Sequence, residues 1–410
     1  MKMNAVVAGV GMTRFGKHLD TGLKSLGTEA VKAALEDAGI DAADLEAAYV
    51  GNAAAGLITG QECIRGQVIL RSMGIGRIPT INVENACGTA STAFNLACMT
   101  VSTGCYDVVL ALGVEKLYHP DKARTFAALG SGTDVEEFQS MLAGFYADQA
   151  GKEGAAKGAG AGEKRSVAMD FYASVARAHM RRYGTTVEQI AGVSAKNSVH
   201  GSLNPHAQFR EVLTVEEVLA APMVAEPLTR PMCSPIGDGA AAAIVVSERK
   251  ARELGLQRPV RVAASALHSG WDHGPEELDA ASLCAQEAFE EAGVGPEDIG
   301  VIELHDASAI GELAAYDSLG MCPKGEGGKL IDEGATRLGG RIPVNTSGGL
   351  IRKGHPIGAT GIAQIVELTE QLQGRAGKRQ VEGVVAALAE NGGGILNNEA
   401  ACMCVTILTR

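Results

Sequence analysis

The 410-residue sequence contains no apolar run as long as the eighteen or so residues that a membrane span needs, and its N-terminus has no signal-peptide pattern. Positive charge is also scarce, because the sequence has 36 basic residues and 48 acidic ones. The net charge of −12 disfavours nucleic acid as a partner. The nine cysteines are odd in number and irregularly spaced, which favours reduced thiols over a disulfide framework. We therefore expect a cytoplasmic protein that binds neither nucleic acid nor a membrane.

Aromatic residues are few, at 4%, whereas hydrophobic residues make up 46% and glycine occurs 53 times. This composition is typical of a folded, tightly packed α/β protein, and the length suggests about two or three structural units. Uninterrupted Val/Leu/Ala runs alternate with helical patterns, which predicts largely parallel sheets covered on both faces. The fold class expected from the residues is therefore α/β.

The chain repeats itself at an offset of 254 residues. Segment 31–45 returns as segment 285–299, each time as an amphipathic helix ended by glycine, an acidic turn and an apolar strand. We expect two pseudo-symmetric halves, 1–250 and 258–410. A cap or loop insertion at about 118–215 is expected over the mouth of the site, because long insertions in compact domains are usually functional. It includes a flexible glycine-rich loop at 151–162.

The most informative single residue is Cys87, which lies where a short apolar strand gives way to a helix of small residues. Amides at a helix start point outward and the helix dipole lowers a thiol pKa, so a nucleophilic thiolate is expected near neutral pH. The alternative is a small buried core residue, which is the commoner fate of a free cysteine.

Three further motifs carry polar groups. His355 lies between glycines in segment 345–361, and His305 follows the repeated strand in segment 303–308. Asn391 and Gly393 belong to a glycine-rich segment placed after the strand predicted at 383–388. Taken singly, each of these segments also fits a surface turn. Together with Cys87 they describe acyl-transfer chemistry, in which a thiol is activated by an imidazole and backbone amides hold an oxyanion.

This set of motifs, in this order, resembles the thiolase superfamily over nearly the whole chain, and most closely its sterol-carrier-protein-type branch. The resemblance implies a layered α-β-α-β-α sandwich of two halves, a loop domain that helps to hold coenzyme A, and a dimer. It implies that Cys87 takes the acyl group, that His355 is the base, and that His305, with His355, stabilises the enolate oxygen of the departing thioester. The amides of Cys87 and Gly393 would form the second oxyanion hole.

Two departures from the family pattern concern proton transfer. Asn391 stands where ordinary thiolases carry a second cysteine, and Ala307 stands where sterol-carrier-type enzymes supply it. The protonating group is therefore open among water, His305 and His355. Coenzyme A is expected as co-substrate, with no covalently bound cofactor and no metal. The candidate residues for coenzyme A contacts are Arg181, Arg182, Ser347 and Gly348.

Three functions compete at this point. The first is a thiolase that cleaves a 3-oxoacyl-CoA through an acyl-Cys87 intermediate, with a branched or aromatic substrate such as benzoylsuccinyl-CoA as one possibility. The second is a retro-aldol carbon–carbon lyase, which needs no nucleophilic cysteine. The third is a non-catalytic subunit that binds lipid or acyl-CoA. Relatives of this type also suggest a homodimer that works with a small zinc-ribbon and OB-fold subunit.

Overall fold

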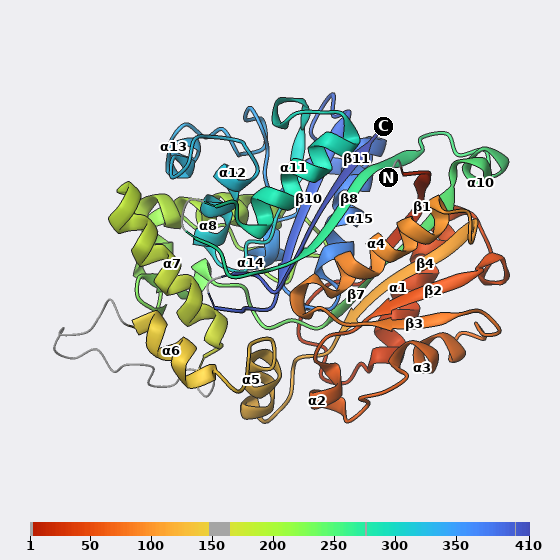
Figure 1. Ribbon diagram of the computed structural model, residues 1–410, viewed down its shortest axis with the longest axis horizontal. Helices are drawn as coiled ribbons and strands as arrows, with labels where there is room; N and C mark the ends of the chain where they lie inside the picture. Colours follow the sequence, from red (N-terminus) through yellow and green to blue (C-terminus); the bar gives the residue numbers. More distant parts are fainter. Residues whose placement is uncertain (1–2, 147–164, 275–276, 398) are drawn as a thin grey trace.

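The computed structural model describes residues 3–146, 165–274, 277–397 and 399–410 (Figure 1). The predicted glycine-rich loop at 151–162 lies outside the described residues. The described strands form one nine-stranded mixed sheet in the order β3-β2-β4-β7-β1-β8-β11-β10-β9, and a separate pair, β5 with β6. The strands are β1 (Ala5–Met12), β2 (Ala47–Gly51), β3 (Thr80–Val83), β4 (Val108–Glu115), β5 (Met223–Ala225), β6 (Leu228–Thr229), β7 (Gly239–Ser247), β8 (Val260–Ser269), β9 (Val301–Glu303), β10 (Ala386–Gly393) and β11 (Cys402–Thr409).

The helices of the described residues cover both faces of this sheet and build the region around the mouth of the site. They are α1 (Leu23–Ala38), α2 (Ala55–Thr59), α3 (Arg65–Arg71), α4 (Thr89–Ser102), α5 (Lys122–Gly130), α6 (Phe138–Tyr146), α7 (Val167–Tyr183), α8 (Val187–Ser202), α9 (Val215–Ala220), α10 (Glu248–Glu253), α11 (Ala280–Ala292), α12 (Ala309–Ser318), α13 (Gly327–Asp332), α14 (Gly349–Lys353) and α15 (Thr360–Gln373). None of them is both long and apolar enough to cross a membrane.

The strand order shows the internal repeat directly. Strands β2, β4, β7 and β1 of the first half correspond to β9, β10, β11 and β8 of the second, and the two sets meet where β1 pairs antiparallel with β8. The repeated helices α1 and α11 both end at a glycine in the left-handed conformation, Gly39 at φ +66° and Gly293 at φ +68°. Glycine ends both helices because a side chain would disfavour this backbone shape.

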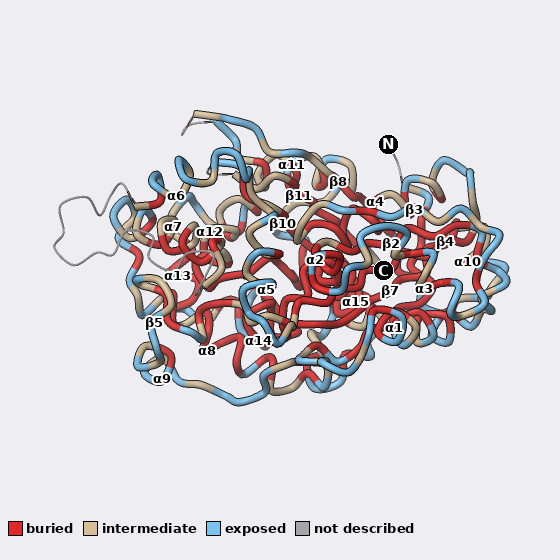
Figure 2. Tube along the Cα trace, turned by 90° about the horizontal axis from the view of Figure 1, so that it is seen from below, coloured by how far each residue is buried: buried red, intermediate tan, exposed pale blue. Residues whose placement is uncertain are grey.

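Alternating residues of the central strands face different layers. Val6 and Ala8 of β1 pack toward α1, whereas Ala5 and Val7 pack toward the layer that contains α4 and α15. Buried backbone accordingly concentrates around α15 and β7 and gives way to exposed segments at the periphery (Figure 2). The predicted layered α/β fold is thereby confirmed, with the paired helices α4 and α15 as its central layer. The expectation of largely parallel sheets is wrong, because five of the eight strand pairings in the sheet are antiparallel.

One strand boundary differs in a way that matters for the site. The apolar run at 383–388 predicted a strand that ends before the glycine-rich segment, but β10 runs from Ala386 to Gly393. Glu390 and Asn391 are therefore strand residues, paired with Val405 and Cys404 of β11. The pairing with β11 continues the strand past the apolar run, because ladder hydrogen bonds depend on the backbone and not on side-chain hydropathy.

Candidate active site

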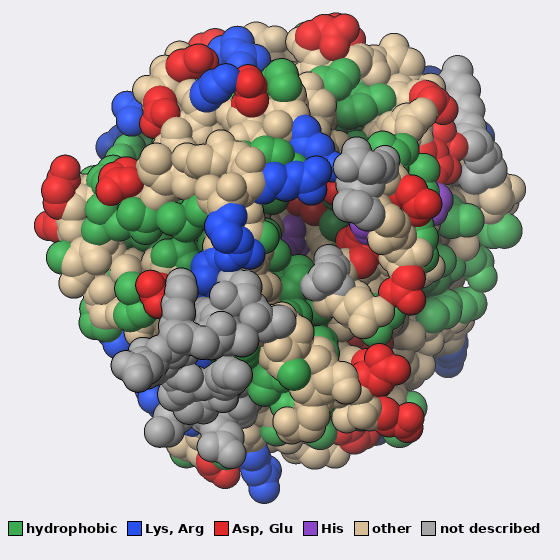
Figure 3. All heavy atoms as spheres, turned by 60° about the vertical axis from the view of Figure 1, so that its left-hand side comes forward, with side chains coloured by type: hydrophobic (Ala, Val, Ile, Leu, Met, Phe, Trp, Pro, Cys, Tyr) green, Lys and Arg blue, Asp and Glu red, His purple; other side chains and the backbone are tan. Residues whose placement is uncertain are grey.

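A cavity of about 750 Å³ opens among loops from both halves of the sheet and the helices α5 and α7. Figure 3 shows a hollow in this face of the molecule, with histidine side chains inside it and basic side chains along part of its rim. Cys87, His305, His355 and Gly393 all line the cavity. The four residues come from four separate motifs, so the fold brings together groups that lie up to about 300 positions apart in the sequence.

Cys87 occupies a single tight turn, Ala86–Gly88, immediately before α4. The preceding residue, Ala86, has φ +47°, a left-handed conformation that a residue with a Cβ rarely adopts and that stores strain. The Thr89 hydroxyl supports the turn, because its oxygen accepts a hydrogen bond from the Asn85 amide at 2.8 Å and its proton goes to the Ala86 carbonyl at 2.6 Å. The local sequence thus presents the thiol on a strained turn at the cavity wall.

The expected lowering of the Cys87 pKa is wrong for the resting site. Burial raises the pKa of the thiol to about 12, and the carboxylates of Glu115 and Glu84 raise it further, while the amides of Gly394 and of Cys87 itself oppose them. Loss of hydration disfavours the thiolate more than the helix start favours it. Cys87 is therefore a neutral thiol that needs a base.

His355 is buried beside the thiol and has the properties of that base. Its Nδ1 lies 2.8 Å from the Thr360 hydroxyl, which in turn donates its proton to the Pro356 carbonyl at 3.2 Å. The Thr360 oxygen must therefore accept from Nδ1–H, which leaves Nε2 as the free acceptor. Burial, followed by the nearby His305 and Lys353, lowers the His355 pKa well below its ordinary value, so the imidazole is neutral.

His305 follows β9 and faces His355 edge to face, with ring centroids 5.1 Å apart and planes at 89°. Its backbone amide donates to Glu390 Oε2 at 2.8 Å, which anchors the loop to β10. Burial lowers the pKa of His305 to about 4, against an opposing effect of the nearby Asn391 side chain. One ligand atom each from Cys87, His305 and His355 lies within 4.8 Å of the others, so a neutral thiol sits against two neutral imidazoles.

The end of β10 closes the site from the other side. Asn391 donates from Nδ2 to the Cys87 carbonyl at 3.3 Å, and a Cβ on Gly393 would lie 2.3 Å from both the Asn85 carbonyl oxygen and the Gly88 nitrogen. Only glycine permits so close an approach of the two backbones. Besides that of Cys87 itself, the amide that acts on the Cys87 thiol is that of Gly394, the last glycine of the same predicted glycine-rich segment.

Glu115 is a second residue that the sequence did not single out. It is fully buried at the end of β4, where its carboxylate accepts the amides of Ala53 and Ala54 at 3.2 Å and that of Gly358 at 3.1 Å. Burial raises its pKa to about 7. The only signal in the sequence was an acidic residue directly after an apolar strand. Glu115 ties the Cys87 half to the loop between His355 and α15.

The predicted coenzyme A contacts lie outside the cavity wall. Ser347 is completely buried, and its hydroxyl and amide both donate to Glu303, at 2.5 and 2.9 Å. Gly348, at φ +100°, turns the chain into α14, and Arg181 and Arg182 belong to the exposed last turn of α7. Their role toward coenzyme A stays a prediction, whereas Arg230 is an exposed cation that does line the cavity.

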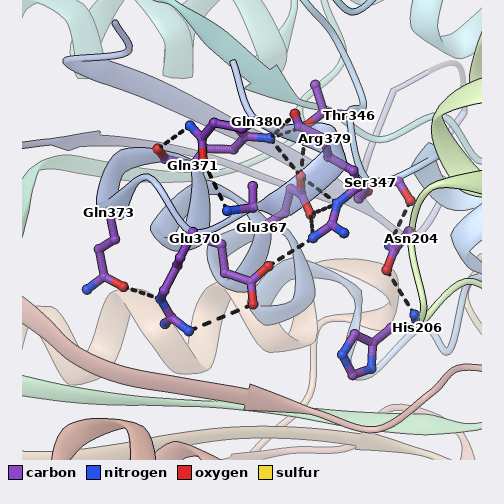
Figure 4. A network of polar contacts seen from close by, with 12 residues as sticks. Asn204, His206, Thr346, Ser347, Glu367, Glu370, Gln371, Gln373, Arg379 and Gln380 are labelled. Atoms are coloured by element: carbon purple, nitrogen blue, oxygen red, sulfur yellow. Dashed lines mark hydrogen bonds and ion pairs between the residues drawn. The ribbon is translucent and has the colours of Figure 1, made fainter. Parts of the chain in front are cut away.

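A buried polar network supports the histidine loop from behind (Figure 4). Arg379 pairs with both Glu367 and Glu370 at 2.9 Å, and Glu367 also accepts the Thr346 hydroxyl at 3.0 Å. Next to it, Asn204 donates to the Ser347 carbonyl at 2.8 Å. These contacts fix the segment that leads to His355, so its position depends on charges about 10 to 25 residues further along the chain.

Known proteins share both halves of this architecture. The family model "Thiolase, N-terminal domain" matches residues 5–249, and the model "Thiolase C-terminal domain-like" matches residues 266–408. The chain is 42% identical over 396 residues to an acetyl-CoA acetyltransferase of Methanothermobacter thermautotrophicus, with 95% of this chain and 96% of the relative covered. It is 36% identical over 416 residues to the benzoylsuccinyl-CoA thiolase subunit BbsB of Thauera aromatica, with coverages of 98% and 99%.

Human sterol carrier protein 2 is 38% identical to the chain over 397 residues, which cover 94% of this chain and 69% of that protein. Among solved structures, the Ltp2-ChsH2(DUF35) aldolase superposes with a TM-score of 0.76 at 25% identity, over 99% of this chain and 98% of that chain. Because both family models and the full-length relatives agree with the motifs and the fold, the chain belongs to the thiolase family and is an acyltransferase.

Proposed function

We propose that the protein cleaves a 3-oxoacyl-CoA with free coenzyme A through a covalent acyl-Cys87 intermediate. The observation that carries this proposal is the approach of Cys87, His305 and His355 to within 4.8 Å of one another in a cavity. A neutral thiol next to an imidazole with a free Nε2 is the arrangement that nucleophilic catalysis by cysteine requires.

In the first step, His355 Nε2 accepts the Cys87 proton and the thiolate attacks the C3 carbonyl of the substrate. The amides of Cys87 and of the glycine pair Gly393–Gly394 hold the resulting oxyanion. The C2–C3 bond then breaks, and its electron pair becomes the enolate of the departing acyl-CoA, whose oxygen lies toward His305 and His355. Free coenzyme A finally removes the acyl group from Cys87, and the reverse sequence is a Claisen condensation.

We further propose that the acyl group is branched or aromatic, of the benzoylsuccinyl-CoA type. The relationship to BbsB supports this, as do the apolar side chains in the cavity wall, which include Phe126, Leu129, Phe171, Val175 and Met403. Incubation with a panel of acyl-CoAs, followed by mass measurement of the Cys87 peptide, tests the proposal. A site that accepts acetyl but no bulkier group would overturn this substrate class.

The acyl-enzyme itself is tested by Cys87→Ala, with the exposed Cys63 replaced by alanine as a matched control. We expect Cys87→Ala to abolish both thiolysis and acyl labelling, and Cys63→Ala to change neither. Full thiolytic activity of Cys87→Ala would refute the mechanism. Selective alkylation of Cys87 among the nine cysteines further separates this function from that of a non-catalytic acyl-CoA-binding subunit.

A second candidate, retro-aldol cleavage of an acyl-CoA, is favoured by the similarity to the Ltp2-ChsH2(DUF35) aldolase. Product analysis with and without free coenzyme A discriminates the two reactions, because only thiolysis consumes the thiol. Cleavage that proceeds without coenzyme A and without Cys87 would establish the lyase.

We also propose a cytoplasmic homodimer with a cap at about 118–215, and a complex with a small zinc-ribbon and OB-fold subunit. The nine free cysteines support a reducing compartment, and α5 and α7 within the proposed cap line the cavity. The subunit named in the solved DUF35 complex supports the partner. Native purification tests it: a stoichiometric zinc-containing protein is expected, and its absence would count against the complex.

A further inference from the structure

The proposed thiolysis needs a proton at C2 of the departing acyl-CoA, and Asn391 and Ala307 occupy both positions at which this family carries the cysteine that would supply it. Both imidazoles have lowered pKa values and are neutral at rest. The proton that His355 takes from Cys87 is needed again when the Cys87 thiolate leaves the acyl group. A resting donor has to be a group that carries its proton at neutral pH and faces the cavity.

Tyr172, on α7, is such a group. It lines the same cavity as Cys87, and in the described part of the chain its hydroxyl has no hydrogen-bond partner. The ring is held in place from two sides: it stacks edge-on against Phe171, with centroids 5.3 Å apart, and it lies over Gly311 of α12. A Cβ on Gly311 would lie 3.2 Å from the tyrosine Cε1, so the glycine leaves room for the ring.

Two of the groups that act on the Tyr172 hydroxyl, Cys87 and Glu390, line the same cavity. Burial raises its pKa first, and the next causes in order of size are the charges of Cys87, Glu390 and Asp306. The hydroxyl is therefore protonated at neutral pH, as the missing cysteine thiol would be.

Two other groups in the cavity fit the role less well. The Cys233 thiol donates to the Thr229 carbonyl at 3.5 Å, and its pKa is raised to about 12 by burial alone, without any contribution from Cys87. Glu390 has a pKa raised to about 7, but one of its oxygens accepts the His305 amide, which makes it the anchor of that loop. Tyr172 is thus the donor whose hydrogen-bonding capacity is unused.

We propose that the Tyr172 hydroxyl protonates C2 of the departing acyl-CoA, an inference that rests on the thiolase function proposed above. Its O–H bond breaks as a C–H bond forms with the electron pair released from C2–C3. The tyrosinate then takes the proton of the incoming coenzyme A thiol, whose sulfur attacks the acyl-Cys87 carbonyl. The Cys87 thiolate leaves and recovers its proton from the His355 imidazolium, so atoms and charges balance over the cycle.

The test uses Tyr172→Phe, which removes one oxygen and keeps the ring, with Tyr183→Phe at the far end of the same helix as its control. Thiolysis, and deuterium exchange at C2 of an acyl-CoA in D₂O, are each expected to fall by about 10²-fold or more. Transfer of an acyl group from a simple acyl-CoA to Cys87 is expected to slow by less than about 10-fold, because a thiolate leaves without help from a strong acid.

The outcomes separate the two proposals. Rates of thiolysis and exchange in Tyr172→Phe within about twofold of the wild-type rates would overturn the assignment of Tyr172. If Cys87→Ala is inactive in the same assays, the proposed thiolase function is still supported. Loss of exchange in Glu390→Gln but not in Tyr172→Phe would assign the proton to Glu390 and also overturn the inference. Full activity of Cys87→Ala would instead remove the function on which the inference rests.

Discussion

The two halves of the molecule hold their candidate catalytic groups at equivalent places by different physical means. Cys87 precedes α4 and His355 precedes α15, the paired helices of the central layer. The Cys87 turn is held without a cation, by the Thr89 hydroxyl and by the Glu84 carboxylate, which accepts the Ala86 amide at 2.6 Å. The His355 loop is held by buried ion pairs, with Lys353 Nζ 3.1 Å from Glu303 and Arg379 2.9 Å from Glu367.

This difference follows from what each group has to do. A buried cation beside Cys87 would stabilise a permanent thiolate, whereas supports without a cation leave the thiol protonated until a base removes the proton, which is the role proposed for His355. The imidazole needs a fixed ring orientation more than a particular charge nearby, and a rigid buried network provides it. The two halves thus share a fold, but the Cys87 turn has a strained backbone whereas the His355 loop is held rigidly by buried ion pairs.

The largest effect is expected where the base itself is removed. His355→Ala should lower kcat for thiolysis by about 10³- to 10⁴-fold, because Cys87, with a pKa of about 12, has no other acceptor with the same access. Alkylation of Cys87 at pH 7 should slow in parallel. His119→Ala, at a turn before α5, serves as the control, and a His355→Ala enzyme that keeps wild-type alkylation rates would contradict this role.

Removal of the buried ion pair between Arg379 and Glu367 tests how much the charged network stabilises the second half. Arg379→Met should lower the free energy of unfolding by about 3–5 kcal/mol, because it leaves Glu367 buried without its cation. The double variant Arg379→Met with Glu367→Gln should recover part of this loss. Urea unfolding of the three proteins measures the difference, and additive losses in the double variant would show that the pair does not act as a unit.

The supporting hydroxyls of the two halves allow a direct comparison. Thr360→Val removes the acceptor of the His355 Nδ1 proton and should lower kcat by about 10- to 100-fold, with little change in KM. Thr360→Ser should restore most of the rate. Thr89→Val instead loosens the Cys87 turn, so it should slow acylation and lower stability by about 1–2 kcal/mol. Identical pH–rate profiles in Thr360→Val and Thr89→Val would contradict the different roles assigned to the two hydroxyls.

The smallest effect concerns Glu115, which joins the two halves. Its pKa of about 7 in the folded state lies above that of an exposed glutamate, so the folded protein holds a proton that the unfolded chain has released. This contribution to stability is present at low pH and is lost as the pH rises from about 4.5 to 7. Between pH 5 and pH 7.5 the free energy of unfolding should therefore fall less steeply with pH in Glu115→Gln than in the wild type. The difference in slope should correspond to about one bound proton. An unchanged slope would show that Glu115 is ionised throughout.

Several features of the fold and site were predictable because they depend on local patterns. The repeat of α1 and α11, with their terminal glycines, and the layered α/β class follow from periodicity and turn chemistry. The motifs around Cys87, His305 and His355 were distinctive enough to predict a shared site, and the structure brings the three side chains together.

Other features could not be predicted from the sequence because they depend on residues that are distant along the chain. Nothing local to Thr360, Glu115 or Gly394 shows what each one contacts, because each touches a candidate catalytic group or its loop through a contact that only folding creates. The strand β10 reaches past its apolar run for the same reason, since β11 supplies its partners.

The sequence by itself determined the class of fold, the internal repeat and the candidate nucleophile with its two histidines, because each of these depends on spacing and residue type along the chain. Only the tertiary structure decided the protonation states and the supporting contacts. Burial raises the Cys87 pKa to about 12, where a helix start alone predicted a thiolate, and folding brings Tyr172 into the same cavity as that thiol. Solvation and proximity are properties of the packed molecule, and no single segment contains them.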